Sequence, residues 1–303
     1  MRTWPKLDPA SDHDTLSILH LASQMLGKIR VRHAPWTNHG WHVALQPNAR
    51  GLVTLPTAAD DGRTFTLALD LCRHAIVLTT SRGEREELGF DQRSIAALHS
   101  GLVDMLRRHG LPSDFSGKPN EIPDARPFAE DDAARSYDPD SATRFREALA
   151  AMLPVFERFR AGFTGKSSPV HFWWGSFDLA VTRFSGRTAP THPGGVPGLP
   201  DRVTREAYSQ EVSSAGFWAG GVTQAAPFFY SYAYPEPADF RERQITAGGW
   251  DADWQEFTLP YDEVRTAPDP EAVLTSFLQS TYDAAADLAE WDRVKLEREP
   301  VAP

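Results

Sequence analysis

The sequence predicts an α+β fold of two related halves, each a helix, then an antiparallel sheet, then a second helix. Three observations support this prediction. Amphipathic helical patterns alternate along the chain with groups of short strand patterns. Turn residues separate the strands at hairpin spacing, which favours antiparallel pairing. The length of 303 residues lies near the upper limit for one hydrophobic core, so we expect two closely packed units.

The N-terminal half is assigned to residues 1–115. A helix is expected after Asp8-Pro9, followed by short strands at 28–33, 41–45 and 51–55 and by a hairpin over 64–71 and 74–80. Cys72 falls in this strand pattern and is expected in the core. A further amphipathic helix is predicted to be capped by Asp91 and to end at Gly110.

Residues 116–137 lack periodicity but contain apolar anchors, and they are predicted to be an ordered connector. The C-terminal half, 138–303, begins with a helix capped by Asp138, in which Pro154 is expected to cause a kink. Strands are predicted at 207–214, 228–234 and 254–259. Asp269-Pro270 predicts the start of the last long helix.

A short sequence match suggests that the halves are related by an internal pseudo-twofold repeat. Gly27-Lys28 is followed by His33 and Trp36, and Gly165-Lys166 is followed at the same spacing by His171 and Trp174. Each copy is expected to follow a helix and to lead into an apolar strand. The alternative is a chance similarity between two helix-to-strand corners.

Composition narrows the possible partners. The net charge of -10 argues against a nucleic-acid partner and against a polybasic membrane patch. Cys72 is the only cysteine, which excludes an intrachain disulfide and a cysteine-based zinc site. The N-terminal residues lack the apolar segment of a signal peptide, so we expect a cytoplasmic protein with no membrane partner. The oligomeric state stays open.

Several long segments resemble one known family: GKSSPVHFWWGSFDLAVTRFSG, HPGGVPGLP, EVSSAGFWAGG, SYAYPEP, NHGWHVAL and RTAPDPEAVLTSFLQSTYDAAADLAEWDR. They are similar to the bacterial domain-of-unknown-function family 5996 over nearly the whole chain. This resemblance implies no activity, cofactor or catalytic residue, so the chemistry must be inferred from the residues themselves.

The region from 165 to 200 gathers most of the side chains capable of chemistry, and it contains the loop in which His192 precedes Pro193-Gly194-Gly195. A metal site for zinc, iron or manganese is one hypothesis, with His33, His39, His42, His171 and His192 as candidate ligands. No recognised ligand spacing supports it. The alternative is that these histidines hydrogen-bond the backbone or stack on tryptophans.

An aromatic cleft is the second hypothesis. Trp173 and Trp174 would form its walls, together with Trp36, Trp41, Phe177, Phe217 and Trp218, and Arg183 would orient a carboxylate or phosphate. Asp178 and Glu211 lie in apolar strand patterns, where burial would suit them to proton transfer. Core packing of the aromatic residues and ion pairing of the carboxylates are the alternatives.

The favoured functional hypothesis is an enzyme that acts on a small polar or anionic molecule, and a divalent metal is its candidate cofactor. Its candidate catalytic residues are His171, His192, Asp178 and Glu211, and its candidate binding residues are Trp173, Trp174 and Arg183. The alternative is a non-catalytic small-molecule-binding or sensor module that uses the same cleft.

Overall fold

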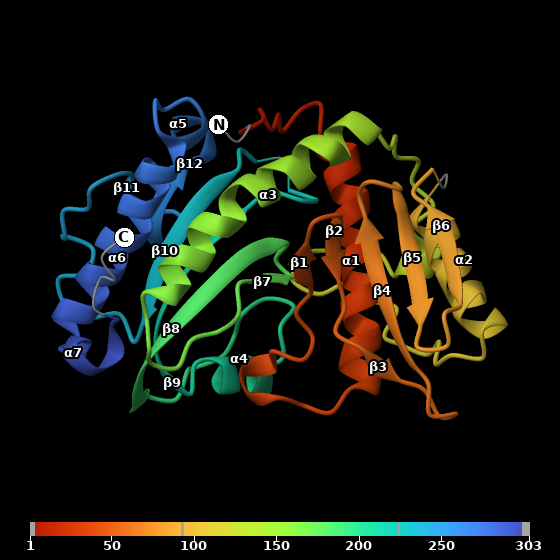
Figure 1. The fold of residues 1–303 in the computed structure, drawn as a ribbon, viewed down its shortest axis with the longest axis horizontal. Coiled ribbons are helices and arrows are strands. Elements are labelled where there is room, and N and C mark those ends of the chain that lie inside the picture. The colour runs from red at the N-terminus through yellow and green to blue at the C-terminus, as the bar shows by residue number, and fades with distance from the viewer. Residues whose placement is uncertain (1–3, 92–93, 224, 299–303) are drawn as a thin grey trace.

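The computed structural model describes residues 4–91, 94–223 and 225–298. These residues form seven α-helices and two antiparallel sheets, which confirms the predicted α+β class. In Figure 1, α1 (His13–His33) runs through the centre, with the strands of residues 64–89 on one side and those of residues 178–260 on the other. No helix in the described ranges combines the length and apolar character that a membrane crossing requires.

The first sheet has the order β1-β2-β4-β5-β6, and β3 pairs with β4. Its strands are β1 (Gln46–Asn48), β2 (Gly51–Val53), β3 (Thr57–Ala58), β4 (Thr64–Asp70), β5 (Ala75–Thr80) and β6 (Arg85–Gly89). The predicted hairpin is present as β4 and β5, with Leu67 opposite Leu78. Alternate residues of β4 are buried where α1 packs, and α2 (Ile95–Arg108) contacts α1 and β6.

The second sheet has the order β11-β12-β10-β9-β8-β7. Its strands are β7 (His171–Trp173), β8 (Asp178–Thr188), β9 (Gln210–Trp218), β10 (Phe228–Tyr234), β11 (Gly249–Asp251) and β12 (Glu256–Pro260). Helices α3 (Pro139–Ala161) and α6 (Pro270–Leu288) contact each other and pack on this sheet. Leu179, Val181 and Phe217 are buried on the helix-covered face, so the alternate residues of β8 and β9 point the other way.

One backbone bridge joins the two sheets. The amide of Leu45 donates to the carbonyl of Phe172 at 2.9 Å, and the amide of Phe172 donates back at 2.8 Å. This bridge brings the segment before β1 against β7. The N-terminal half therefore meets the second sheet at the edge that β7 forms.

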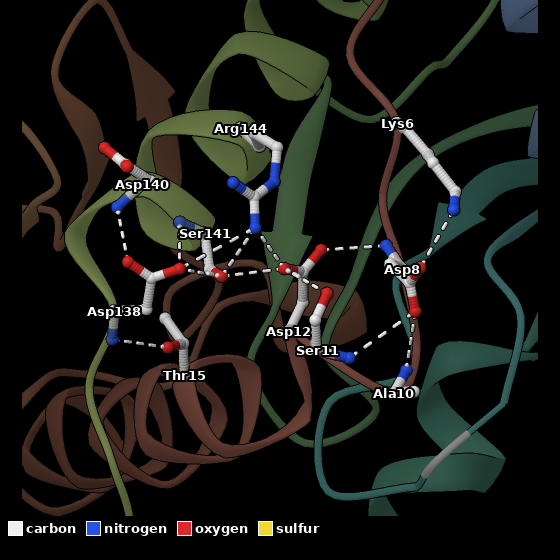
Figure 2. Close-up of polar contacts among 10 residues, drawn as sticks. All are labelled: Lys6, Asp8, Ala10, Ser11, Asp12, Thr15, Asp138, Asp140, Ser141 and Arg144. Atoms are coloured by element: carbon white, nitrogen blue, oxygen red, sulfur yellow. Dashed lines mark hydrogen bonds and ion pairs between the residues drawn. The ribbon is translucent and has the colours of Figure 1, made fainter.

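A buried carboxylate ties the starts of α1 and α3 together (Figure 2). Asp12, whose side chain is 1% exposed, accepts hydrogen bonds from the backbone amide of Asp8 at 2.8 Å and from the hydroxyl of Ser141 at 2.7 Å. The guanidinium of Arg144 pairs with the same carboxylate at 2.5 Å. The side chain of Asp138 caps α3, as predicted, and Asp269 caps α6 in the same way.

Several sequence predictions were wrong. Residues 28–33 complete α1 and form no strand, because Arg30 is buried and its guanidinium donates to the carbonyls of His42 and Pro56. Residues 41–45 precede β1, and 207–209 precede β9. Ser94, and not Asp91, caps α2. Cys72 is exposed in the turn after β4, since the strand ends at Asp70.

The two copies of the short motif lie on different elements. Gly27, Lys28 and His33 belong to α1, whereas Gly165 follows α3 and His171 opens β7. The motif therefore does not mark equivalent positions. Short helices complete the described chain: α4 (Asp201–Ala207), α5 (Tyr261–Arg265) and α7 (Arg293–Leu296), with 3-10 turns at Asn38–Gly40 and Phe128–Glu130. A symmetry relation between the halves remains a prediction.

Candidate functional site

A cavity of about 730 Å³ lies on the face of the second sheet that α3 and α6 leave free. Alternate residues of four strands form its floor: Asp178, Ala180, Thr182 and Phe184 of β8, Val212, Ser214 and Trp218 of β9, Phe228, Tyr230 and Tyr232 of β10, and Glu256 of β12. The period of two along these strands places all of these side chains on one face.

The remaining walls come from segments distant in sequence. They include the end of α1, residues 36–41, the connector at Asn120 and Glu121, Trp173 and Trp174 of the β7 region, and α4 with the loop before it. Trp254 and Trp36 are 49% and 40% exposed, and both line the cavity, so its boundary reaches the protein surface. The cavity thus lies between both halves of the chain.

A polar stripe on α1 positions two of these walls. His20, Gln24 and Lys28 are buried and spaced four residues apart, which places them on one helix face. The side chain of Gln24 accepts from the backbone amide of Asn120 at 2.7 Å and donates to its carbonyl at 2.8 Å. His20 contacts the carbonyl of Gly175 at 2.9 Å. These bonds hold the connector and the turn after Trp174 at the cavity.

Asp178 is 4% exposed and accepts hydrogen bonds from the hydroxyls of Ser176 and Tyr230. Tyr230 lies on β10 and reaches Asp178 on β8 across Gly216 of β9. Burial raises the pKa of Asp178 to about 6, although both hydroxyl donors act to lower it. The structure therefore places a carboxyl group that titrates near neutral pH on the cavity floor.

Glu121 brings a second carboxyl group to the cavity. Its backbone has a φ of 57°, a left-handed conformation that is uncommon for a residue with a side chain. Two glycines make room for it, since a β-carbon at Gly175 would overlap the Glu121 carboxylate and one at Gly198 its backbone. Burial, and then the nearby charge of Asp178, raise the pKa of Glu121 to about 7.

Glu256 and Lys28 complete the charged groups deep in the site. Burial raises the pKa of Glu256 to about 8, with further contributions from Asp178 and Asp251. Burial lowers the pKa of Lys28 to about 8, and the charge of Glu121 partly opposes this. The ammonium of Lys28 donates to the side-chain carbonyl of Asn120 and lies 5.6 Å from the ring centre of Trp174.

The structure brings some of the sequence-predicted residues to this cavity. Those that line it are His39, Trp173, Trp174 and Asp178, together with Trp36, Trp41 and Trp218 of the predicted aromatic cleft. Phe177 and Phe217 are fully buried in the core. Five of the predicted tryptophans and one of the two predicted carboxylates thus line one cavity, and their role in binding stays a prediction.

Arg183 lies on the opposite face of the sheet. Its guanidinium donates to the carbonyl of Phe159 and lies 3.5 Å from the ring centre of Phe159 and 4.2 Å from that of Tyr282. Arg183 alternates with Thr182 and Phe184, which line the cavity. It is therefore placed against α3 and α6, away from any ligand in the cavity.

The candidate metal ligands are dispersed. His33 contacts Asp114, and His42 accepts from the amide of Thr37. The two ring nitrogens of His171 are buried without a hydrogen-bond partner, and burial lowers the pKa of His171 to about 3. His39 contacts the carbonyl of Glu206 and the ammonium of Lys166. Within the described residues, no three His, Cys, Asp or Glu side chains are grouped to hold a metal ion.

His192 and Glu211 lie outside the large cavity. The ring of His192 stacks on Tyr208 with centroids 5.0 Å apart and accepts from the amide of Gly194 at 3.0 Å. Glu211 pairs with Arg187 at 2.7 Å beside a smaller cavity of about 360 Å³. The loop after His192 still contributes Leu199 and Pro200 to the large cavity.

Sequence reasoning missed Glu121, Glu256 and the tyrosines of β10. Two of these had a signal in the pattern. Tyr230 and Tyr232 alternate with Phe229 and Ser231, and Glu256 alternates with Phe257 and Leu259, which indicates a polar aromatic face opposite an apolar one. Glu121 had no such signal because the connector has no periodicity.

The family model described as "Family of unknown function (DUF5996)" matches residues 4–298. The chain belongs to this family. Comparison with curated proteins gave no match, and neither did comparison with solved structures. Any function of this family member must therefore be argued from the cavity.

Proposed function

We propose that this member of the family is an enzyme that holds a small organic molecule in the large cavity and exchanges protons with it through Asp178 and Glu121. The observation that carries the proposal is that two carboxyl groups in unlike surroundings face one cavity. Asp178 accepts from two hydroxyls, whereas no described residue donates to the carboxyl of Glu121. Unlike surroundings separate the roles of two carboxyl groups in acid–base pairs.

The surroundings of the two carboxyl groups give them different roles. Asp178 is the base, because the hydroxyls of Ser176 and Tyr230 donate to it and stabilise its ionised form, and Glu121, to which no described residue donates, is the acid. The aromatic walls exclude water and orient the substrate. A non-catalytic binding module is the second candidate, favoured by walls that are mostly apolar and aromatic.

Equilibrium dialysis of the full chain against a metabolite extract, followed by mass spectrometry, tests both candidates. We expect at least one compound to be consumed by the wild type but not by Thr182→Trp, which fills the cavity from its floor. The matched control is Thr188→Trp, at an exposed position of the same strand. If the Asp178→Asn variant no longer consumes the compound, the result supports the enzyme hypothesis. Retention of an unchanged compound supports the binding module, and equal behaviour of wild type and Thr182→Trp would overturn both.

A further inference from the structure

The three carboxyl groups of the large cavity lack a directly paired cation among the described residues, although the charge of the Lys28 ammonium acts on one of them, Glu121. Glu121, Asp178 and Glu256 face the cavity, and no ion pair joins any of them to a residue that the structure describes. Neither hydrogen bonds nor ion pairs reach the carboxyls of Glu121 and Glu256 from described residues. Lys28 is the one buried cation of the lining, and its ammonium donates to Asn120. Because an unpartnered carboxylate is costly to desolvate, burial favours the protonated forms of these carboxyl groups, and a positive group in the cavity would stabilise their ionised forms.

The walls suit an organic cation. Tryptophan, tyrosine and phenylalanine rings present negative faces that attract a positive group within about 6 Å of the ring centre. The rings that line the cavity come from distant parts of the chain and include Trp41, Trp173, Tyr208, Trp218, Phe228 and Trp254. The rings of Trp218 and Trp254 lie 5.0 Å apart between centroids, and both contact Phe228. Carboxylates together with aromatic faces are the surroundings that recognise ammonium groups.

Other charges fit the cavity less well. A carboxylate or phosphate would meet three acidic groups, and Arg183, the expected anchor for an anion, lies behind the sheet. The two arginines that do line the cavity, Arg32 and Arg202, are exposed to solvent. A bare metal ion needs several ligands at one point, and the described residues contain no such group. An organic cation can pair with the carboxyl groups through its charge and can also contact the aromatic rings through its carbon substituents.

We propose that the ligand of the large cavity carries a protonated amine or a quaternary ammonium group, which lies between the carboxyls of Asp178, Glu121 and Glu256 and the aromatic walls. This inference rests on the proposed function, because it specifies the substrate class of the same site. The sequence expectation was a small polar or anionic molecule, and this inference replaces the anion with a cation.

Matched probes with one carbon skeleton test the charge directly. Benzylamine, benzyl alcohol and benzoate are titrated into the full chain at pH 7.5 and followed by saturation-transfer NMR and tryptophan fluorescence, with choline and its neutral isostere 3,3-dimethylbutan-1-ol as a second pair. We expect each cation to bind at least tenfold more tightly than its neutral partner, and benzoate to bind weakest. Asp178→Asn and Glu256→Gln should each weaken the cations at least fivefold, whereas Glu211→Gln, outside the cavity, should change nothing.

Equal binding within the set, preference for benzyl alcohol or benzoate, or no binding of either cation would overturn the cation assignment. The dialysis experiment separates this failure from failure of the proposed function. Neutral or anionic metabolites consumed by the wild type and not by Thr182→Trp would leave the cavity as the functional site but with a different substrate class. Loss of cation binding in Glu211→Gln as large as that in Asp178→Asn would also contradict the assignment.

Discussion

The phenol ring of Tyr230 lies directly against the backbone of Gly216, leaving no room for a β-carbon at that position. Gly216 is the residue of β9 that pairs with Tyr230, and on its other side it pairs with Ala180 of β8. The absence of a side chain lets the Tyr230 hydroxyl cross one strand and reach Asp178. A single glycine thus determines the surroundings of the carboxyl that we assign as the base.

We expect Gly216→Ala to displace Tyr230 and to break its hydrogen bond to Asp178. Overpacking and the lost bond should reduce the free energy of unfolding by about 2 kcal/mol, measured by urea denaturation. Loss of the hydroxyl donor should also raise the pKa of Asp178 further. Gly249→Ala on β11 is the control, because a β-carbon there meets nothing within 4 Å. Equal stability of the two variants would contradict this account of Gly216.

Stability should fall as the pH rises through the range in which Asp178 ionises. Burial raises its pKa from 3.8 to about 6, so the folded state keeps a proton that the unfolded chain releases. The contribution of this bound proton to the free energy of unfolding is fully present below pH 3.8 and is lost as the pH rises through about 6. Asp178→Asn, which cannot ionise, should therefore lose about 2 kcal/mol less than the wild type between pH 4 and pH 8.

Urea denaturation at unit steps of pH measures this difference. Glu121 and Glu256, whose pKa values are raised to about 7 and about 8, should preserve part of the decline in the variant. Asp239→Asn, at an exposed position, serves as the control and should follow the wild type. Parallel curves for Asp178→Asn and the wild type would show that Asp178 ionises at its ordinary pKa.

Arg183 should matter for stability and not for ligand binding. Arg183→Ala removes a side chain buried among Phe159, Phe163 and Tyr282 and should cost about 3 kcal/mol of unfolding free energy, because it leaves a void. In Arg183→Met the methionine side chain fills most of that space, so the free energy of unfolding should fall by less than in Arg183→Ala. Calorimetric unfolding measures the first effect and benzylamine titration the second. A tenfold loss of binding in the folded Met variant would return Arg183 to the site.

His171 should behave as a buried framework residue. Burial lowers its pKa to about 3, so the unfolded chain takes up a proton that the folded state does not, and stability is lost as the pH falls from 6.5 toward 3. His171→Leu should reduce the loss of stability between pH 6.5 and pH 3. At pH 7 the free energy of unfolding should stay the same or rise by about 1 kcal/mol, because the substitution removes two buried polar atoms that have no partner among the described residues. His192→Leu controls for the general effect of the exchange. Lost metabolite consumption in a stable His171→Leu variant would instead support the catalytic role expected from the sequence.

The parts of the fold that follow from local signals were predictable. Asp138 and Asp269 stand before prolines and cap their helices, because a side-chain oxygen next to free backbone amides needs no tertiary partner. The hairpin of β4 and β5 follows from the alternation of apolar residues along β4 and from the apolar run that returns after a short turn. The strand prediction for residues 28–33 was wrong, although their alternating β-branched and charged residues are typical of a strand. The helix is favoured because it buries Arg30 where its guanidinium donates to the carbonyls of His42 and Pro56.

The sequence by itself determined the α+β class, most long helices and the aromatic composition of the site, since these depend on periodicity and on caps within a few residues. Only the tertiary structure decided which charges meet. Glu121 reaches the cavity because the neighbouring residue, Asn120, is bound through its backbone by Gln24, which lies 96 residues before Asn120. Arg183 is excluded from the cavity because a strand turns successive side chains to opposite faces, and the packing of α3 and α6 chose the face that Arg183 occupies. Such choices depend on contacts between distant segments, which neither spacing nor composition encodes locally.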